Sequence, residues 1–258
     1  MNKKYIKIYL LTILYILLNI SIYAQPKIIL KLDDLQAKAK LFNNALPVFD
    51  YLSNNSIKAG FGIMRMQNIS DSQISDIINY LSKKDSNGEP LFEIWNHGLD
   101  HTRNNPEGTW EFSGTSYEYQ KAHFDSANSL IKNKLGITAH TFGAPYNQID
   151  TTFLRVMSED KNMKVLLLGK LTPDKSTGIN NLKNRVNMEI KTGFVNFDYF
   201  VKNYNSNKNK YKDYIVLQGH PVYWKADSFN QFKKVIEFLK SEGCQFVTPY
   251  AYYLSLKK

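Results

Sequence analysis

Near its beginning the chain reads Ile28-Ile29-Leu30-Lys31-Leu32-Asp33-Asp34, an apolar run of strand length that ends in two adjacent acids. Similar apolar runs recur along the chain, and segments with helical periodicity separate them. This alternation predicts a parallel sheet with helices packed on its outside. Because the runs are almost continuously apolar, we expect both faces of the sheet to be covered.

The expected elements fill the chain from residue 27 onward. We expect strands at 28–32, 59–64, 91–95, 139–142, 165–168, 185–188, 214–217 and 244–247, and helices at 41–52, 69–81, 116–135, 150–159 and 228–241. Seven or eight strand–helix units in about 230 residues predict an α/β fold, a distorted barrel of about seven parallel strands. The Asn- and Lys-rich stretch 202–212 is expected to be a solvated loop.

The N-terminal segment has the composition of a secretory signal peptide. Three lysines precede an apolar core at residues 8–20, and Ala24 offers a small residue for cleavage. We therefore expect residues 1–24 to be removed and residues 25–258 to form one secreted or periplasmic domain. The alternative is an uncleaved membrane anchor, but the apolar run is short for a spanning helix, so no stable membrane insertion is expected.

The distribution of charge argues against a nucleic-acid-binding protein, and the cysteine content excludes one with an intrachain disulfide. The formal charge is +10, but the basic residues are spread along the chain and form no coherent face, so no nucleic-acid partner is expected. The charge is interpreted as an aid to solubility or to attraction by anionic envelope polymers. The single cysteine, Cys244, excludes an intrachain disulfide and is expected to be a small core residue.

Chemically active residues follow four of the apolar runs. In a parallel barrel the carboxyl ends of the strands meet on one face, where active sites form. The residues expected on that face are Asp33, Asp34, His97, His101, Pro145, Tyr146 and His220.

His97 and His101 are spaced four residues apart. On one helical turn they would share a face, and a carboxylate from elsewhere would complete a three-ligand metal site with open positions. Zinc or another divalent transition metal fits this ligand set. The alternative is two unrelated histidines on a polar surface.

The adjacent acids Asp33 and Asp34 can divide their roles, one binding the metal and the other acting as a general base. His220 can act as a general acid because an imidazole titrates near neutral pH. The alternatives are a polar turn with a helix cap for the acids, and a histidine bonded to backbone at a strand end.

Together these segments resemble the polysaccharide deacetylases, the NodB-homology group of carbohydrate esterase family 4. The family motif T-F-D-D corresponds to residues 31–34, and H-[ST]-x-x-H corresponds to residues 97–101. An R-x-P-[YG]-like motif corresponds to residues 142–146, and a Leu-x-x-His segment corresponds to residues 217–220. The resemblance extends over residues 28 to 221.

The resemblance implies a metal-dependent hydrolase that removes acetyl groups, N-acetyl groups first, from an acetylated cell-envelope or extracellular glycan, with zinc as the expected metal. It also implies the role of each matched residue: Asp33 as general base, Asp34, His97 and His101 as metal ligands, His220 as general acid, and the backbone N–H of Tyr146, after Pro145, as part of an oxyanion hole.

The chain departs from the family pattern at three places. Gly143 stands where the family has an arginine that orients the base, and Arg185, from another strand, could replace it. Gly98 stands in place of a Ser or Thr, and residues 185–189 occupy the place of an unrecognisable fourth motif. Trp110, in a loop after the histidine motif, is expected to stack on a sugar ring.

These departures keep other functions open. A close variant is an O-acetyl esterase on a polysaccharide, which differs only in the leaving group. A second class is a non-catalytic glycan-binding barrel that retains the metal site, and a third is a hydrolase of small amides on the same barrel. Neither the sugar and its linkage nor the oligomeric state follows from these residues.

Overall fold

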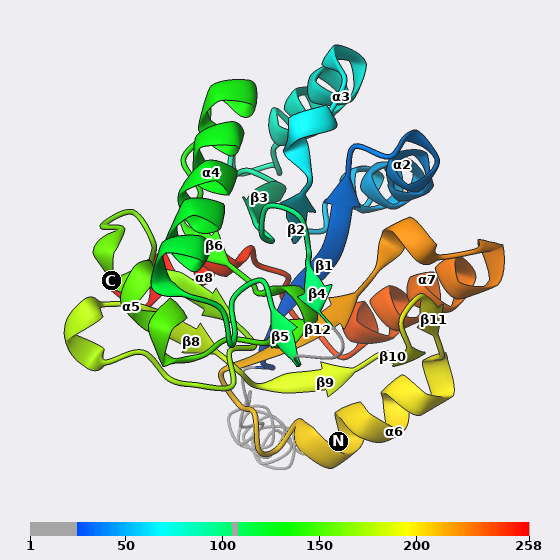
Figure 1. Ribbon diagram of the computed structural model, residues 1–258. Helices are drawn as coiled ribbons and strands as arrows, with labels where there is room; N and C mark the ends of the chain where they lie inside the picture. The colour runs from blue at the N-terminus through cyan, green and yellow to red at the C-terminus, as the bar shows by residue number, and fades with distance from the viewer. Residues whose placement is uncertain (1–24, 105–107, 258) are drawn as a thin grey trace, which may run out of the picture.

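The computed structural model describes residues 25–104 and 108–257, and its centre is a curled sheet of eight parallel strands (Figure 1). The strand order is β8-β7-β6-β3-β2-β1-β12-β9. Within the described residues no ladder joins the edge strands β8 and β9, so the sheet forms a half-barrel. The strands are β1 (Lys27–Gln36), β2 (Ala59–Met64), β3 (Phe92–Asn96), β6 (Thr141–Phe142), β7 (Val165–Leu167), β8 (Asn180–Leu182), β9 (Arg185–Asn187) and β12 (Tyr214–Gly219).

Helices surround the convex face of the sheet (Figure 1). They are α2 (Ala39–Asn54), α3 (Asp71–Leu81), α4 (Tyr117–Leu135), α5 (Thr151–Glu159), α6 (Phe197–Asn207) and α7 (Ala226–Ser241). A further helix, α8 (Pro249–Ser255), contributes Tyr252 and Tyr253 to a cluster that includes Ile29 and Trp95. The described residues also contain two short antiparallel pairs, β4 (Arg103–Asn104) with β5 (Thr109–Trp110) and β10 (Glu189–Lys191) with β11 (Phe194–Val195), and four single 3₁₀ turns. No helix in the described ranges has both the length and the apolar character needed to cross a bilayer.

The predicted distorted barrel of parallel strands is confirmed, with three local differences. Strand β8 was not anticipated, because its sequence Asn180-Asn181-Leu182 carries little apolar character. The strand expected at 244–247 is wrong, since only Phe246 forms a bridge, to Ile28. The loop expected at 202–212 begins as helix α6. The predicted signal peptide lies outside the described residues.

Helix boundaries follow from local capping chemistry. The Ser70 side chain accepts a hydrogen bond from the Gln73 backbone, and the Gln73 side chain accepts one from the Ser70 backbone, so a capping box begins α3. The α4 helix ends at Gly136, whose φ of 71° is a left-handed conformation that glycine adopts without strain. The α2 helix continues through Pro47, which lies inside it.

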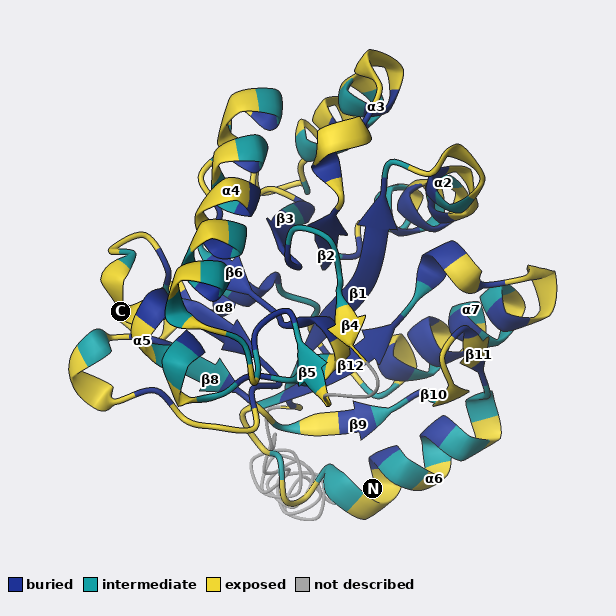
Figure 2. Ribbon diagram, viewed as in Figure 1, coloured by how far each residue is buried: buried dark blue, intermediate teal, exposed yellow. Residues whose placement is uncertain are grey.

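Strand β1 is buried along almost its whole length and contributes to two layers of the interior (Figure 2). Ile28, Leu30 and Leu32 belong to the large core between sheet and helices. Ile29 belongs to the smaller cluster inside the barrel, with Trp95 among its members. Because side chains alternate along a strand, Lys31 shares the inward side of Ile29 and projects toward the barrel interior.

Glu93 is a half-buried carboxyl on β3, away from the carboxyl ends of the strands. Glu93 lines a cavity of about 640 Å³ together with Tyr250 and other residues near the start of the barrel. The Tyr250 backbone N–H donates to Glu93 Oε2 at 2.8 Å. Burial raises the pKa of Glu93 to about 7, although hydrogen bonds oppose this shift. Glu93 therefore makes the stability of the fold dependent on pH.

We predict that Glu93→Gln stabilises the protein at pH 8 and not at pH 4.5. The folded state retains a proton on Glu93 that the unfolded chain releases as pH rises above about 4.5, so wild-type stability falls as pH rises toward about 7. The amide keeps an acceptor for the Tyr250 N–H and carries no charge. The gain at pH 8 is at most about 3 kcal/mol, measured by chemical denaturation.

The control is Glu118→Gln, which removes an exposed carboxyl on α4 and should give no pH-dependent gain. Equal effects of Glu93→Gln at both pH values would contradict the assigned pKa shift.

Candidate metal-dependent active site

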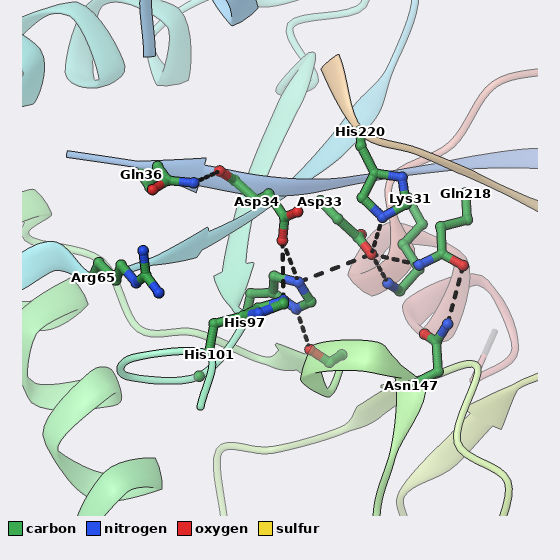
Figure 3. A network of polar contacts seen from close by, with 12 residues as sticks. Lys31, Asp33, Asp34, Gln36, Arg65, His97, His101, Asn147, Gln218 and His220 are labelled. Carbon is green, nitrogen blue, oxygen red and sulfur yellow. Dashed lines mark hydrogen bonds and ion pairs between the residues drawn. The ribbon is translucent and has the colours of Figure 1, made fainter. Parts of the chain in front are cut away.

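Asp34, His97 and His101 converge at the carboxyl ends of β1 and β3 (Figure 3). The Nε2 atoms of His97 and His101 lie 3.1 and 3.3 Å from Asp34 Oδ1. One ligand atom from each of the three residues lies within 4.8 Å of the other two. Two imidazole nitrogens and one carboxylate oxygen match the three-ligand sets of catalytic zinc sites, so the residues fit a divalent metal.

A bulge in β1 brings both acids to the same side of the strand. The register between β1 and β2 shifts between Leu32 and Leu35, and Asp34 has a left-handed φ of 68°. In a regular strand Asp33 and Asp34 would point to opposite faces, because successive side chains alternate. Instead His97 Nε2 lies within 4.0 Å of Asp33 Oδ2 and 3.1 Å of Asp34 Oδ1. The bulge thus allows the two carboxylates to share one site.

The prediction that His97 and His101 lie on one helical turn is wrong. Residues 97–101 form an irregular loop, in which His101 has a φ of 60° and Gly98 a φ of 87°. A Cβ atom at Gly98 would lie 2.6 Å from Glu111 Oε2, so the loop requires glycine here for both conformation and space. The imidazoles meet because of the left-handed turn of the loop.

Glu111 holds this loop in place from the segment that follows β5. Its side chain is fully buried, and Oε1 accepts hydrogen bonds from the N–H groups of Leu99 and Asp100 at 2.6 and 3.3 Å. Oε2 accepts the His101 N–H at 2.8 Å. His123 Nδ1 lies a further 3.2 Å from Oε1. The carboxylate is therefore engaged by backbone donors and acts as a support for the loop, although it also lies near Asp100 and His123 in a second acidic cluster.

The ring of His97 is oriented by the carbonyl of Gly143. Its Nδ1 donates a hydrogen bond to that oxygen at 2.6 Å, which places a proton on Nδ1 and turns Nε2 toward the candidate ligand cluster of Asp34, His97 and His101. Burial alone would raise the pKa of Asp34, but the hydrogen bonds of His101 and His97 more than offset it and hold this pKa well below its usual range. Asp34 is therefore ionised at neutral pH.

Asp33 lies beside the cluster of Asp34, His97 and His101, and only one of its two carboxylate oxygens accepts hydrogen bonds. Its Oδ2 accepts hydrogen bonds from Lys31 Nζ at 2.5 Å and from Gln218 Nε2 at 2.6 Å. Its buried Oδ1 has no hydrogen-bond partner within the described part of the chain. Burial would raise the pKa of Asp33, but the charge of Lys31 and the nearby imidazoles hold it below its usual value. Asp33 is thus an ionised carboxylate with one unengaged oxygen.

His220 approaches Asp33 from the end of β12. Its Nε2 lies 3.9 Å from Asp33 Oδ2, and its Nδ1 donates to Glu189 Oε2 at 2.7 Å. Glu189 Oε1 also accepts the His220 backbone N–H at 2.9 Å and Trp224 Nε1 at 2.6 Å. Burial lowers the pKa of His220, but Glu189 and Asp33 outweigh it and raise this pKa above the usual value. The imidazole of His220 therefore keeps its proton to a higher pH than a free imidazole does.

Four further residues were predicted for the site, namely Pro145, Tyr146, Trp110 and Arg185. Pro145 is buried at the start of a 3₁₀ turn, and the exposed ring of Tyr146 packs on His101 with ring centroids 4.4 Å apart. Trp110 is half-buried in the antiparallel pair β4–β5, and Arg185 is an exposed residue of β9. In the described part of the chain, Arg185 forms neither a hydrogen bond nor an ion pair with Asp33. The roles of Trp110 and Arg185 stay predictions.

Four polar residues of the site were not identified from the sequence, namely Lys31, Glu111, Glu189 and Gln218. Lys31 is a charged residue inside an apolar strand, two positions before Asp33, and that interruption was its only signal. Gln218 lies two positions before His220, with the same strand periodicity. Glu111 and Glu189 lie in segments without a readable pattern, so nothing linked them to the histidines.

Solved structures of family 4 carbohydrate esterases share this fold. A family 4 acetyl xylan esterase from Clostridium thermocellum, solved with a cobalt ion, has a TM-score of 0.61 and 17% identity over 88% of this chain and 91% of that chain. For a peptidoglycan deacetylase from Bacillus subtilis the TM-score is 0.58 and the identity 17%, over 91% and 93% of the two chains. A pseudoenzyme of the same family from Bacillus anthracis gives 0.59 and 11%, over 89% and 66%.

No protein-family model matches the chain, and no curated protein sequence matches it. The structural neighbours are family 4 carbohydrate esterases, which confirms the fold expected from the motif resemblance. At these identities the likeness extends to the fold, and the pseudoenzyme shows that this fold also occurs without activity.

We predict that Glu111→Gln weakens zinc binding about 10- to 100-fold, as is typical when a group supporting the ligands is lost. The substitution keeps the shape of the side chain but places an amide NH₂ against backbone N–H donors, which loosens the loop that carries both histidines. Affinity is measured by competition with a chromophoric chelator.

The matched control is Asp125→Asn, an exposed carboxyl on α4 whose loss should leave zinc affinity unchanged. An unaltered affinity in Glu111→Gln would show that the loop conformation does not depend on this carboxylate.

Proposed function

We propose that this protein is a metal-dependent hydrolase that removes acetyl groups, N-acetyl groups first, from a cell-envelope or extracellular glycan. The observation that carries the proposal is the position of Asp33 between the ligand cluster and His220. Its Oδ2 lies 4.0 Å from His97 Nε2 and 3.9 Å from His220 Nε2. A site that only binds a metal has no need of a separate ionised carboxylate and a second imidazole at these distances.

The proposed ligands are Asp34, His97 and His101, and zinc or another divalent transition metal fits them. When bound, such a metal polarises the acetyl carbonyl and acidifies water. The cobalt ion in the Clostridium thermocellum structure supports a divalent metal in this fold.

Asp33 and His220 would then carry out the two proton transfers of the reaction, one as acceptor and the other as donor. Asp33 accepts a proton from the attacking water through Oδ1, the oxygen without a partner. The backbone N–H of Tyr146 helps to hold the carbonyl oxygen as negative charge develops on it. As the carbon–nitrogen bond breaks, His220 donates its proton to the leaving amine, and acetate is the second product.

The raised pKa of His220 supports the choice of an amide substrate. An amine leaving group must be protonated as it departs, and Glu189 keeps His220 protonated to a higher pH than a free imidazole. An O-acetyl ester would be hydrolysed by the same groups, with a smaller demand on His220 because an alcohol is the better leaving group.

We predict that Asp33→Asn lowers the rate of acetate release about 10²- to 10⁴-fold while the protein still binds one equivalent of zinc. The amide retains the size of the carboxylate but cannot accept the proton. The assay measures acetate released from acetylated glycans with and without chelator. His97→Ala, as the comparison, should lose both zinc and activity.

The proposal is wrong if the wild-type protein releases no acetate from any acetylated glycan yet binds glycans as well as Asp33→Asn does. The protein would then be a glycan-binding barrel that retains a metal site, and a pseudoenzyme occurs among the structural neighbours of this fold.

We also propose that the protein is exported, which the sequence of residues 1–24 supports. Expression in a bacterial host with a secretory pathway should yield exported protein whose mass corresponds to a chain beginning at Gln25. Replacing the apolar core with polar residues should retain the full-length chain in the cytoplasm. Membrane-bound protein with Met1 intact would contradict cleavage.

A further inference from the structure

Lys31 is a lysine with no exposed surface inside the barrel (Figure 3). Removing an ammonium group from water is unfavourable unless an opposite charge meets it closely. Burial accordingly lowers the pKa of Lys31, while Asp33 acts against this effect. A lysine in such a position needs a specific partner.

Lys31 directs its charge at Asp33. The Nζ atom lies 2.5 Å from Asp33 Oδ2, and within the described residues it forms no other ion pair. The Nζ atom also lies over the indole ring of Trp95, 5.0 Å from the ring centroid. The ammonium is thus held between an aromatic wall and the carboxylate.

Gly143 makes room for this arrangement. A Cβ atom at position 143 would lie 2.8 Å from the Trp95 ring and 3.1 Å from Lys31 Cε. Any larger side chain at 143 would have to displace the indole or the lysine. The place where the family pattern has an arginine is therefore filled by Lys31 and Trp95.

We propose that Lys31 is the positioning residue for Asp33 and supplies the cation that the missing arginine would otherwise provide. This inference rests on the proposed function, in which Asp33 is the general base. Arg185 is exposed and forms no ion pair with Asp33 in the described part of the chain, whereas Lys31 is in direct contact with it.

A lysine fixes a carboxylate less completely than an arginine does, because it is a point charge without a planar pair of donors. Gln218 provides the second donor, at 2.6 Å from the same oxygen, and Asn147 Nδ2 donates to Gln218 Oε1 at 3.1 Å. Lys31 and Gln218 together occupy Oδ2 and leave Oδ1 available. The two residues therefore determine which oxygen of Asp33 receives the proton.

The test is Lys31→Met, which keeps the length of the stem and removes the charge. We expect kcat to fall about 10²-fold, with KM changed less than about twofold, because the base is misplaced while substrate contacts remain. Zinc affinity and the absorption spectrum of the cobalt-loaded protein should stay as in the wild type. Lys27→Met, at the other end of the same strand, is the matched control and should leave kcat unchanged.

A double variant separates positioning from general damage to the fold. If Lys31 acts only through Asp33, Lys31→Met combined with Asp33→Asn should be no slower than Asp33→Asn alone. Losses that multiply, or a Lys31→Met protein with wild-type kcat, would overturn the inference while leaving the proposed function intact. Wild-type protein without acetate release, or an Asp33→Asn protein with full activity, would instead overturn the proposed function and this inference with it.

Discussion

Lys31, Asp33 and Asp34 carry charge on one strand at positions closed to solvent, and the site is arranged so that each charge meets its complement. Asp33 forms an ion pair with the ammonium of Lys31, and Asp34 contacts the imidazoles of His97 and His101. The bulge in β1 makes this division possible, because a regular strand would turn Asp34 toward the helices, on the side where Leu30 and Leu32 pack in the hydrophobic core. The backbone conformation of β1 thus determines which cation neutralises each buried acid at the end of the strand.

Much of this arrangement was predictable because a parallel sheet gathers the carboxyl ends of its strands. Residues far apart in the chain, such as Asp34, His97 and His220, could be assigned to one face once the strands were recognised. The strands themselves were recognisable because their runs are apolar and short. Position along a strand therefore carries more information about a site than any single short motif does.

What escaped prediction depended on contacts between segments. The left-handed conformation of the loop at residues 97–101 depends on Glu111, and the sequence of that loop does not indicate that Glu111 contacts it. Helix α6 was hidden by its Asn- and Lys-rich composition, although Phe200 and Tyr204 recur at helical spacing and are buried. The stretch 244–247 has strand composition, but the chain turns into α8 at Pro249 before a ladder can form.

Trp95 lies beneath the charged residues and fills the space beside Gly60, Gly62 and Gly143, so the floor of the site is one rigid indole. This packing ties positions 31 and 143 together as the protein evolves. A side chain gained first at 143 collides with the indole and the lysine stem, and a lysine lost first deprives the buried Asp33 carboxylate of its nearest cation. Each single step is therefore expected to be harmful on its own, and positions 31 and 143 are expected to change together, a case of sign epistasis.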